Sequence, residues 1–287
     1  MLDAGASWTV AVMQPGGDPL TRLAQSLIDA EVYSDEQDDT LYQIMATINR
    51  SSQGLVEAIK QSGLSGEQNV LLVVDQFEEI FRFHEAGKKG KQLAPDFIRW
   101  IIEAVNQSEV PIYVVLTMRS DFLGDCARFT GLAEAINQGE YLVPKLSRDQ
   151  LQKAIEGPAR VAGGEVSRRL IQRLLNDVGE QADQLPVLQH SLMRSWESCK
   201  SRANAAGLVM DLEDYEAVGG MRDALSSHAD EVLRELRNEM SDQCDIVELI
   251  GRVFKALTEK GMDNRGIRRP TRLDVLSEIT AAPKDQV

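Results

Sequence analysis

Three short runs of apolar residues stand out in the first half of the chain. They are WTVAVM at Trp8–Met13, VLLVV at Val70–Val74 and PIYVVL at Pro111–Leu116. Continuous apolar runs of this length are typical of strands buried on both faces, as in parallel sheets. A shorter run, Tyr141–Val143, predicts a fourth strand.

Residues with helical spacing separate these runs. Asp18-Pro19 provides a helix cap followed by proline at the first helical position, and Leu20–Ile28 then forms one apolar helix face. Further helices are expected from Leu41 to about Gln61 and across Phe97–Val105. The alternation predicts an α/β architecture in which right-handed crossovers join parallel strands.

After Leu146 the strand signal disappears and helical patterns remain. Ser147 with Gln150 matches a capping box at the start of a helix. Four more helices are expected at Leu170–Val178, Leu185–Trp196, Leu225–Leu236 and Ile246–Leu257. We therefore predict three parts, at 1–146, 147–210 and 211–287.

Composition narrows the class of protein. With 287 residues, 43% of them hydrophobic and 26% charged, the chain has the balance of a globular protein. A net charge of −14 disfavours nucleic acid as a partner, and the short basic segment at 265–272, RGIRRPTR, does not reverse that expectation. No stretch approaches the roughly 18 apolar residues of a membrane span. Three scattered cysteines, with no signal peptide pattern, predict a cytoplasmic protein.

The candidate chemistry lies in LLVVDQFEEIF, at 71–81. Asp75 ends an apolar strand, and ligands of open α/β sheets bind beyond the carboxyl ends of the strands. An aspartate there is well placed to hold magnesium, and Glu78 or Glu79 can orient or deprotonate an attacking water. A capping aspartate at the end of a core strand is the alternative explanation of the same pattern.

Several blocks in the same order resemble the novel STAND NTPases, bacterial signalling ATPases of the P-loop class. The resemblance covers almost the whole chain, beginning with the strand and helix that follow the phosphate-binding loop in that family. It is carried by WTVAVMQPGGDPLTRLA, DQFEEIF, VVLTMRSDFL, AIEGPARVAG, LPVLQHSL and YEAVGGMRDALSSHAD. The implied fold is a P-loop NTPase-like parallel sheet lacking its first strand and loop, then an all-α helical subdomain at 147–210 and the start of a winged-helix region at 211–287.

The resemblance also assigns roles to the acidic segment. Asp75 matches the Walker B aspartate that coordinates magnesium. Glu78 and Glu79 match the acidic pair of the family, either of which could be the water-activating base. Related ATPases usually have an acidic residue directly after the aspartate, whereas this chain has Gln76.

Two further residues match family positions outside that segment. Arg119 follows the next strand, where related ATPases place a group that detects the γ-phosphate, and a permanently charged guanidinium suits this role. Asp121 could neutralise Arg119 instead and form a structural pair. Pro186 matches a proline that packs near the nucleotide base, and a first-turn helix proline is an equally good explanation.

One part of the family pattern is missing from the sequence. No glycine-rich loop ending in Lys-Ser or Lys-Thr occurs, and Gly16-Gly17 and Gly163-Gly164 have no lysine in register. In the family that loop would lie just before Met1, so we expect a fragment, with a naturally loop-less relative as the alternative. The resemblance implies an ATP- and Mg²⁺-dependent switch that contacts protein partners through other domains and assembles into homo-oligomers on activation. A non-catalytic scaffold for protein–protein interaction is the alternative.

Overall fold

The computed structural model shows two compact units, residues Met1–Tyr141 and Leu142–Val287. The structure describes residues 7–33, 39–64, 68–81, 90–178, 184–202, 207–239, 246–260, 266–268 and 271–284.

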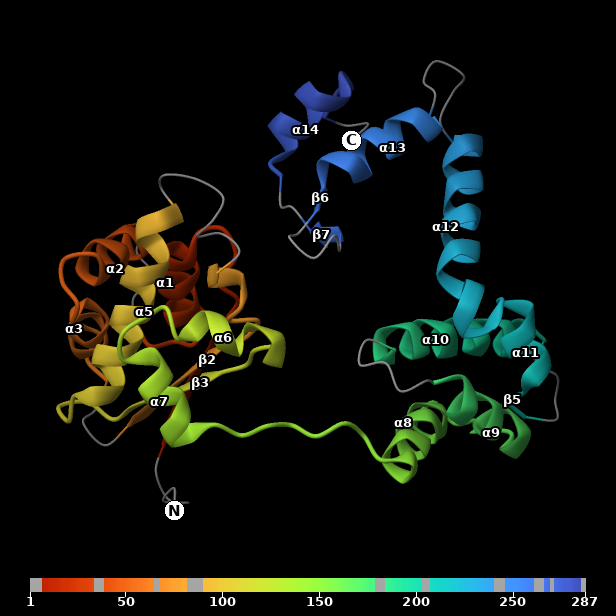
Figure 1. Ribbon diagram of the computed structural model, residues 1–287, viewed down its shortest axis with the longest axis horizontal. Coiled ribbons are helices and arrows are strands. Elements are labelled where there is room, and N and C mark those ends of the chain that lie inside the picture. Colours follow the sequence, from red (N-terminus) through yellow and green to blue (C-terminus); the bar gives the residue numbers. More distant parts are fainter. Residues whose placement is uncertain are drawn as a thin grey trace. The chain divides into compact units, whose positions relative to one another are not determined.

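The first unit is built on a parallel sheet of three strands in the order β1-β2-β3 (Figure 1). The strands are β1 (Trp8–Met13), β2 (Asn69–Val74) and β3 (Ile112–Leu116). Their register aligns Met13 with Val74 and Val74 with Leu116, so the three carboxyl ends lie side by side. The predicted α/β class and the three principal strands are therefore confirmed.

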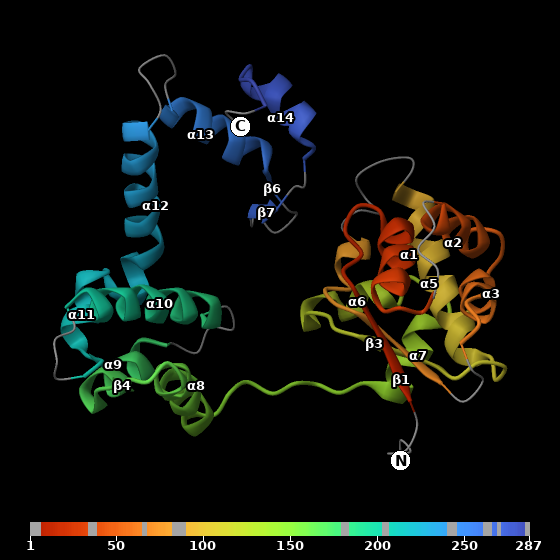
Figure 2. The same cartoon turned by 180° about the vertical axis from the view of Figure 1, so that it is seen from behind.

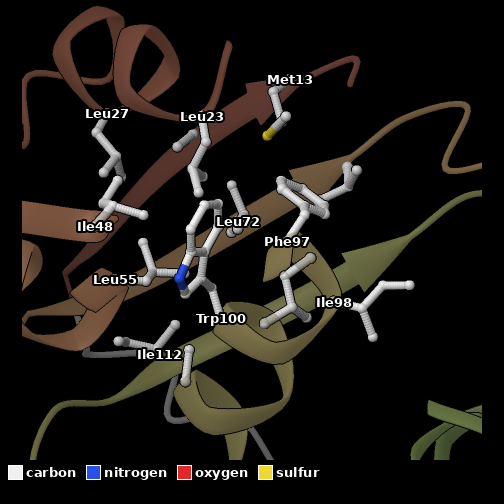
Figure 3. Packing of buried hydrophobic residues seen from close by; sticks show 14 of the residues in the cluster. Met13, Leu23, Leu27, Ile48, Leu55, Leu72, Phe97, Ile98, Trp100 and Ile112 are labelled. Carbon is white, nitrogen blue, oxygen red and sulfur yellow. The ribbon is translucent and has the colours of Figure 1, made fainter. Parts of the chain in front are cut away.

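Four helices pack on one face of this sheet. They are α1 (Pro19–Asp29), α2 (Thr40–Ile48), α3 (Gly54–Gln61) and α5 (Gly90–Asn106). Alternate strand residues such as Leu72 meet fully buried helix residues such as Leu23 and Phe97 (Figure 3). Burying each such side chain stabilises the fold by about 1.5–3 kcal/mol, which makes this layer the main core of the unit.

The opposite sheet face is partly open, which corrects the expectation of strands buried on both faces. Val10 and Val12 of β1 are 46% and 61% exposed, and Tyr113 and Val115 of β3 are 43% and 47% exposed. The strand order moves in one direction along the sheet, and successive right-handed crossovers in one direction place their helices on the same face. An apolar run reports strand propensity, but it does not report which face a helix covers.

The single helix expected from Leu41 to Gln61 is wrong, because the segment forms two helices, α2 and α3. Gly54, the first residue of α3, permits the tight turn between the two helices. A Cβ on this glycine would lie 2.1 Å from the carbonyl oxygen of Ile48, so the backbones approach too closely for any other residue.

The fourth strand expected at Tyr141–Val143 is also wrong. These residues form no strand, and their side chains are 82%, 69% and 77% exposed. A strand needs a neighbouring backbone for its hydrogen bonds, and β3 is the last strand of this sheet among the described residues. The chain between β3 and Tyr141 forms η1 (Ser120–Phe122) and the short helices α6 (Leu123–Cys126) and α7 (Leu132–Gly139).

The second unit is mainly helical, as predicted. Its first part contains α8 (Arg148–Val161), α9 (Arg168–Asp177), α10 (Leu185–Arg202), α11 (Leu212–Ala217) and the long α12 (Gly220–Glu239), seen along its length in Figures 1 and 2. The predicted capping box of Ser147 and Gln150 starts α8. The core of this part includes Leu170 and Leu174 on α9, Met210, and Tyr215 on α11. It therefore draws residues from both sides of position 210, and the predicted boundary there stays a prediction.

Short strands occur where none were expected. The two-residue strands β4 (Glu165–Val166) and β5 (Val209–Met210) pair in parallel. Further along, α13 (Ile246–Ala256) is followed by an antiparallel pair, β6 (Thr258–Lys260) and β7 (Gly266–Arg268), and then by α14 (Leu273–Thr280). Strands of two or three residues leave no hydrophobic periodicity in the sequence. Part of the basic segment at 265–272 lies outside the described residues.

No helix among the described residues is long and apolar enough to cross a membrane.

Candidate functional site

The three strand ends bring three polar side chains together at the carboxyl edge of the sheet. Gln14 follows β1, Asp75 follows β2 and Thr117 follows β3. The Asp75 N–H donates to the carbonyl oxygen of Met13 at 2.8 Å, and the Thr117 N–H donates to Val74 at 3.0 Å. These backbone bonds extend the parallel ladder by one residue and fix the three side chains as neighbours.

Asp75 accepts a hydrogen bond on each carboxylate oxygen. The Thr117 hydroxyl donates to Oδ1 at 2.6 Å, and the Gln14 side-chain amide donates to Oδ2 at 2.9 Å. Because hydrogen bonds to the charged form favour it, the Thr117 hydroxyl and, less strongly, the Gln14 amide lower the pKa of Asp75 below its ordinary value. Asp75 is therefore an oriented, ionised carboxylate at neutral pH.

The backbone turns sharply directly after Asp75. Gln76 adopts a left-handed conformation with φ of 55°, which is unusual for a residue other than glycine. Thr117 holds this turn, because its hydroxyl accepts from the Gln76 N–H at 3.1 Å and its carbonyl oxygen accepts from the Phe77 N–H at 2.9 Å. Left-handed residues other than glycine persist only where their surroundings hold them, and they cluster at functional sites.

Apolar side chains anchor the acidic segment to the core. Phe77, Ile80 and Phe81 are buried. The rings of Phe77 and Phe81 meet edge to face at 5.4 Å, and Phe81 stacks on Phe129 at 5.7 Å. The buried apolar residues of DQFEEIF thus hold the acidic segment in place on the hydrophobic core.

The two glutamates of the segment have different surroundings. Glu79 accepts a hydrogen bond from the backbone N–H of Gly16, in the loop after β1, at 2.9 Å. Glu78 is 7% exposed, and its Oε2 has no hydrogen-bond partner among the described residues. A buried carboxylate oxygen without a partner is costly, so Glu78 carries an unsatisfied acceptor inside the fold, whereas Glu79 is bonded to the loop after β1.

No lysine or arginine of the described part of the chain forms an ion pair with Asp75, Glu78 or Glu79. Three carboxyl side chains within five residues therefore lack a basic partner there, which favours a cation at this edge. The described residues nevertheless contain no group of three or more side chains arranged to hold a metal ion. The donor set fits a magnesium ion held by one carboxylate together with water and phosphate oxygens, and it does not fit an all-protein cage.

Arg119 lies two residues beyond Thr117, at the start of η1. Its guanidinium donates to both carboxylate oxygens of Asp121, at 3.2 Å and 2.9 Å. The structure thus contains the structural pair that was the alternative for this arginine. Both side chains are about half exposed, so the pair is weak enough to exchange partners.

Pro186 is the second residue of α10, in the second unit. That position matches the first-turn location in which proline is tolerated, because the missing N–H would have no partner in the helix. Its side chain is exposed.

The comparison with known protein families agrees with this geometry. The family model Novel STAND NTPase 1 matches residues 1–287. The chain belongs to the novel STAND NTPases. A search of curated proteins gave no match. Membership in this family assigns the chain to the nucleotide-binding switch proteins.

Sequence reasoning found the acidic residues of this STAND NTPase but missed two residues that orient them, Gln14 and Thr117. The sequence did contain a signal for these two residues, because each directly follows a predicted strand. In a parallel sheet the residue directly after each strand lies at the same edge, and both of these positions carry polar side chains. The strand predictions would therefore have located them.

Proposed function

We propose that the carboxyl edge of this sheet is the acidic half of an ATP site, and that Asp75 holds its Mg²⁺. The observation that carries the proposal is the convergence of three strand ends on one oriented carboxylate without a basic partner among the described residues. Bound magnesium would supply charge neutralisation at the phosphates. The chain's own contribution is to hold and orient the Asp75 carboxylate for that ion.

The remaining roles are proposed from the family positions that these residues match. Glu78 or Glu79 would orient or deprotonate the attacking water, and the unpartnered Oε2 of Glu78 favours Glu78. Arg119 would detect the γ-phosphate by leaving Asp121, because an exposed ion pair contributes only about 0–1 kcal/mol.

The sequence contains no phosphate-binding loop, so no residue is assigned the role of cradling the phosphates. We further propose that residues 211–287, which include α13, the β6–β7 pair and α14, begin a winged-helix region, and that the protein is cytoplasmic. In the switch we propose, nucleotide exchange or hydrolysis shifts the protein between a resting state and an assembling state that engages protein partners.

The test is ATP turnover and nucleotide binding by the full-length protein. Asp75→Ala should lower the Mg²⁺-dependent rate of phosphate release by about 100-fold or more, because a metal ion contributes several kcal/mol of charge stabilisation. Asp125→Ala is the matched control, since Asp125 pairs only locally with Arg128 at 3.3 Å. Equal turnover in the wild type and Asp75→Ala would sink the assignment.

The second candidate is a non-catalytic scaffold derived from an NTPase. The Arg119–Asp121 pair favours it, because this pair occupies the guanidinium that would otherwise contact a phosphate. It predicts no phosphate release and no nucleotide-dependent shift of the melting temperature in the wild-type protein. A ligand present at 100 times its Kd would otherwise stabilise the folded state by about 2.7 kcal/mol.

A further inference from the structure

The side-chain amide of Gln14 faces the same carboxylate that the proposed site uses for a cation. Its nitrogen lies 2.9 Å from Asp75 Oδ2. An ionised carboxylate only accepts hydrogen bonds, so the amide must present its NH₂ group there and not its oxygen. The positive end of the amide dipole therefore lies where a cation would approach Oδ2.

The loop that carries Gln14 is bound to the acidic segment a second time. The Gly16 N–H donates to Glu79, and Gly16 has a left-handed φ of 56° that favours glycine. Between these contacts Pro15 is buried, whereas Gln14 is exposed. The helix α1 begins immediately afterwards, capped by Asp18. Both side chains that hold the loop are thus members of the acidic segment.

A cation and an N–H donor compete for the same carboxylate oxygen, because each places positive charge on it. We propose that Gln14 is a positioning residue that orients Asp75 and sets the cation affinity of the site, and that a cation on Asp75 displaces the Gln14 amide and loosens the loop at 14–17. This inference rests on the proposed function, since it assumes that Asp75 holds the ion. The Thr117 hydroxyl stays on Oδ1 and keeps the carboxylate in place.

The experiment measures Mn²⁺ binding to the full-length protein by the loss of the electron paramagnetic resonance signal of free Mn²⁺. Gln14→Leu keeps most of the side-chain volume and removes the competing donor. It should tighten the Asp75-dependent Mn²⁺ Kd by about two- to tenfold, the range expected when a solvent-exposed hydrogen bond no longer competes. Asp75→Asn identifies which part of the binding depends on Asp75.

Gln25→Leu is the matched control. Gln25 makes the same kind of bond, donating to Asp29 at 2.8 Å on the exposed face of α1. Its removal should leave the Mn²⁺ Kd unchanged.

Amide hydrogen exchange of the segment 14–17 provides a second readout. Mn²⁺ should speed exchange there in the wild type, and Gln14→Leu should already show faster exchange without the ion. The inference would be overturned if Mn²⁺ binding depends on Asp75 but wild type and Gln14→Leu show the same Kd and the same loop exchange. That result would leave the proposed function intact. Mn²⁺ binding that Asp75→Asn does not change would overturn both.

Discussion

Thr117 offers the sharpest test of how the acidic site is built. The substitution Thr117→Val keeps the branched shape and removes the hydroxyl. Two hydrogen bonds are lost, the 2.6 Å bond donated to Asp75 Oδ1 and the 3.1 Å bond accepted from the Gln76 N–H. The second loss also removes a support of the left-handed turn at Gln76.

The expected cost follows from these two bonds. A bond to a charged group contributes about 1.5–3 kcal/mol and a neutral one about 0.5–1.5 kcal/mol when buried. Thr117 is exposed, so water replaces part of both bonds. We therefore expect Thr117→Val to lower the free energy of unfolding of the first unit by about 1–2 kcal/mol.

The assay is native-state hydrogen exchange of the amides of β2, which reports on the first unit alone. A loss of about 1–2 kcal/mol speeds exchange by a factor of about 5–30. Thr117→Ser is the matched control, because it retains the hydroxyl and loses only the methyl group. Equal exchange rates in the valine and serine variants would refute the assignment of the effect to the hydroxyl.

The effect should depend on pH in a defined direction. The pKa of Asp75 is lowered in the folded protein, so the stability that this carboxylate contributes is present above its unfolded pKa. That contribution is lost as the pH falls through the folded pKa. The difference between wild type and Thr117→Val should therefore be largest near neutral pH and smaller in acid. A difference that grows on acidification contradicts this account.

Two further substitutions test the fold around the site. Leu72→Ala, on the covered sheet face, should lower the free energy of unfolding by about 2–5 kcal/mol. Val12→Ala, on the open face, should lower it by less than about 1 kcal/mol. Similar losses for the two variants in urea titrations would show that the open face is covered. Gln76→Gly should raise the unfolding free energy by about 0.5–1 kcal/mol because glycine adopts the left-handed conformation without strain, and a clear loss of stability would contradict a strained turn.

Local patterns in the sequence were sufficient for several features. The apolar runs located β1, β2 and β3, and the Ser147 and Gln150 capping box located the start of α8. These features depend on residues within a few positions of one another. The acidic segment was found in the same way, since an apolar strand and the aspartate that ends it are adjacent in the chain.

The contacts that orient the site could not be read from local patterns. Gln14 and Thr117 lie 61 and 42 residues from Asp75 in the sequence, and only the order and register of the strands bring them together. The partner of Glu79 is likewise 63 residues away. The error at Tyr141–Val143 has the same origin, because strand formation depends on a neighbouring backbone and not on side-chain preference alone.

By itself, then, the sequence determined where β1, β2, β3 and most helices form and which acidic residues follow the central strand. It did so because propensity, capping and hydrophobic periodicity act over a few residues. Only the tertiary structure decided that one sheet face is open and that Gln14 and Thr117 share Asp75. Those outcomes depend on strand order and crossover direction, which join residues that are distant along the chain.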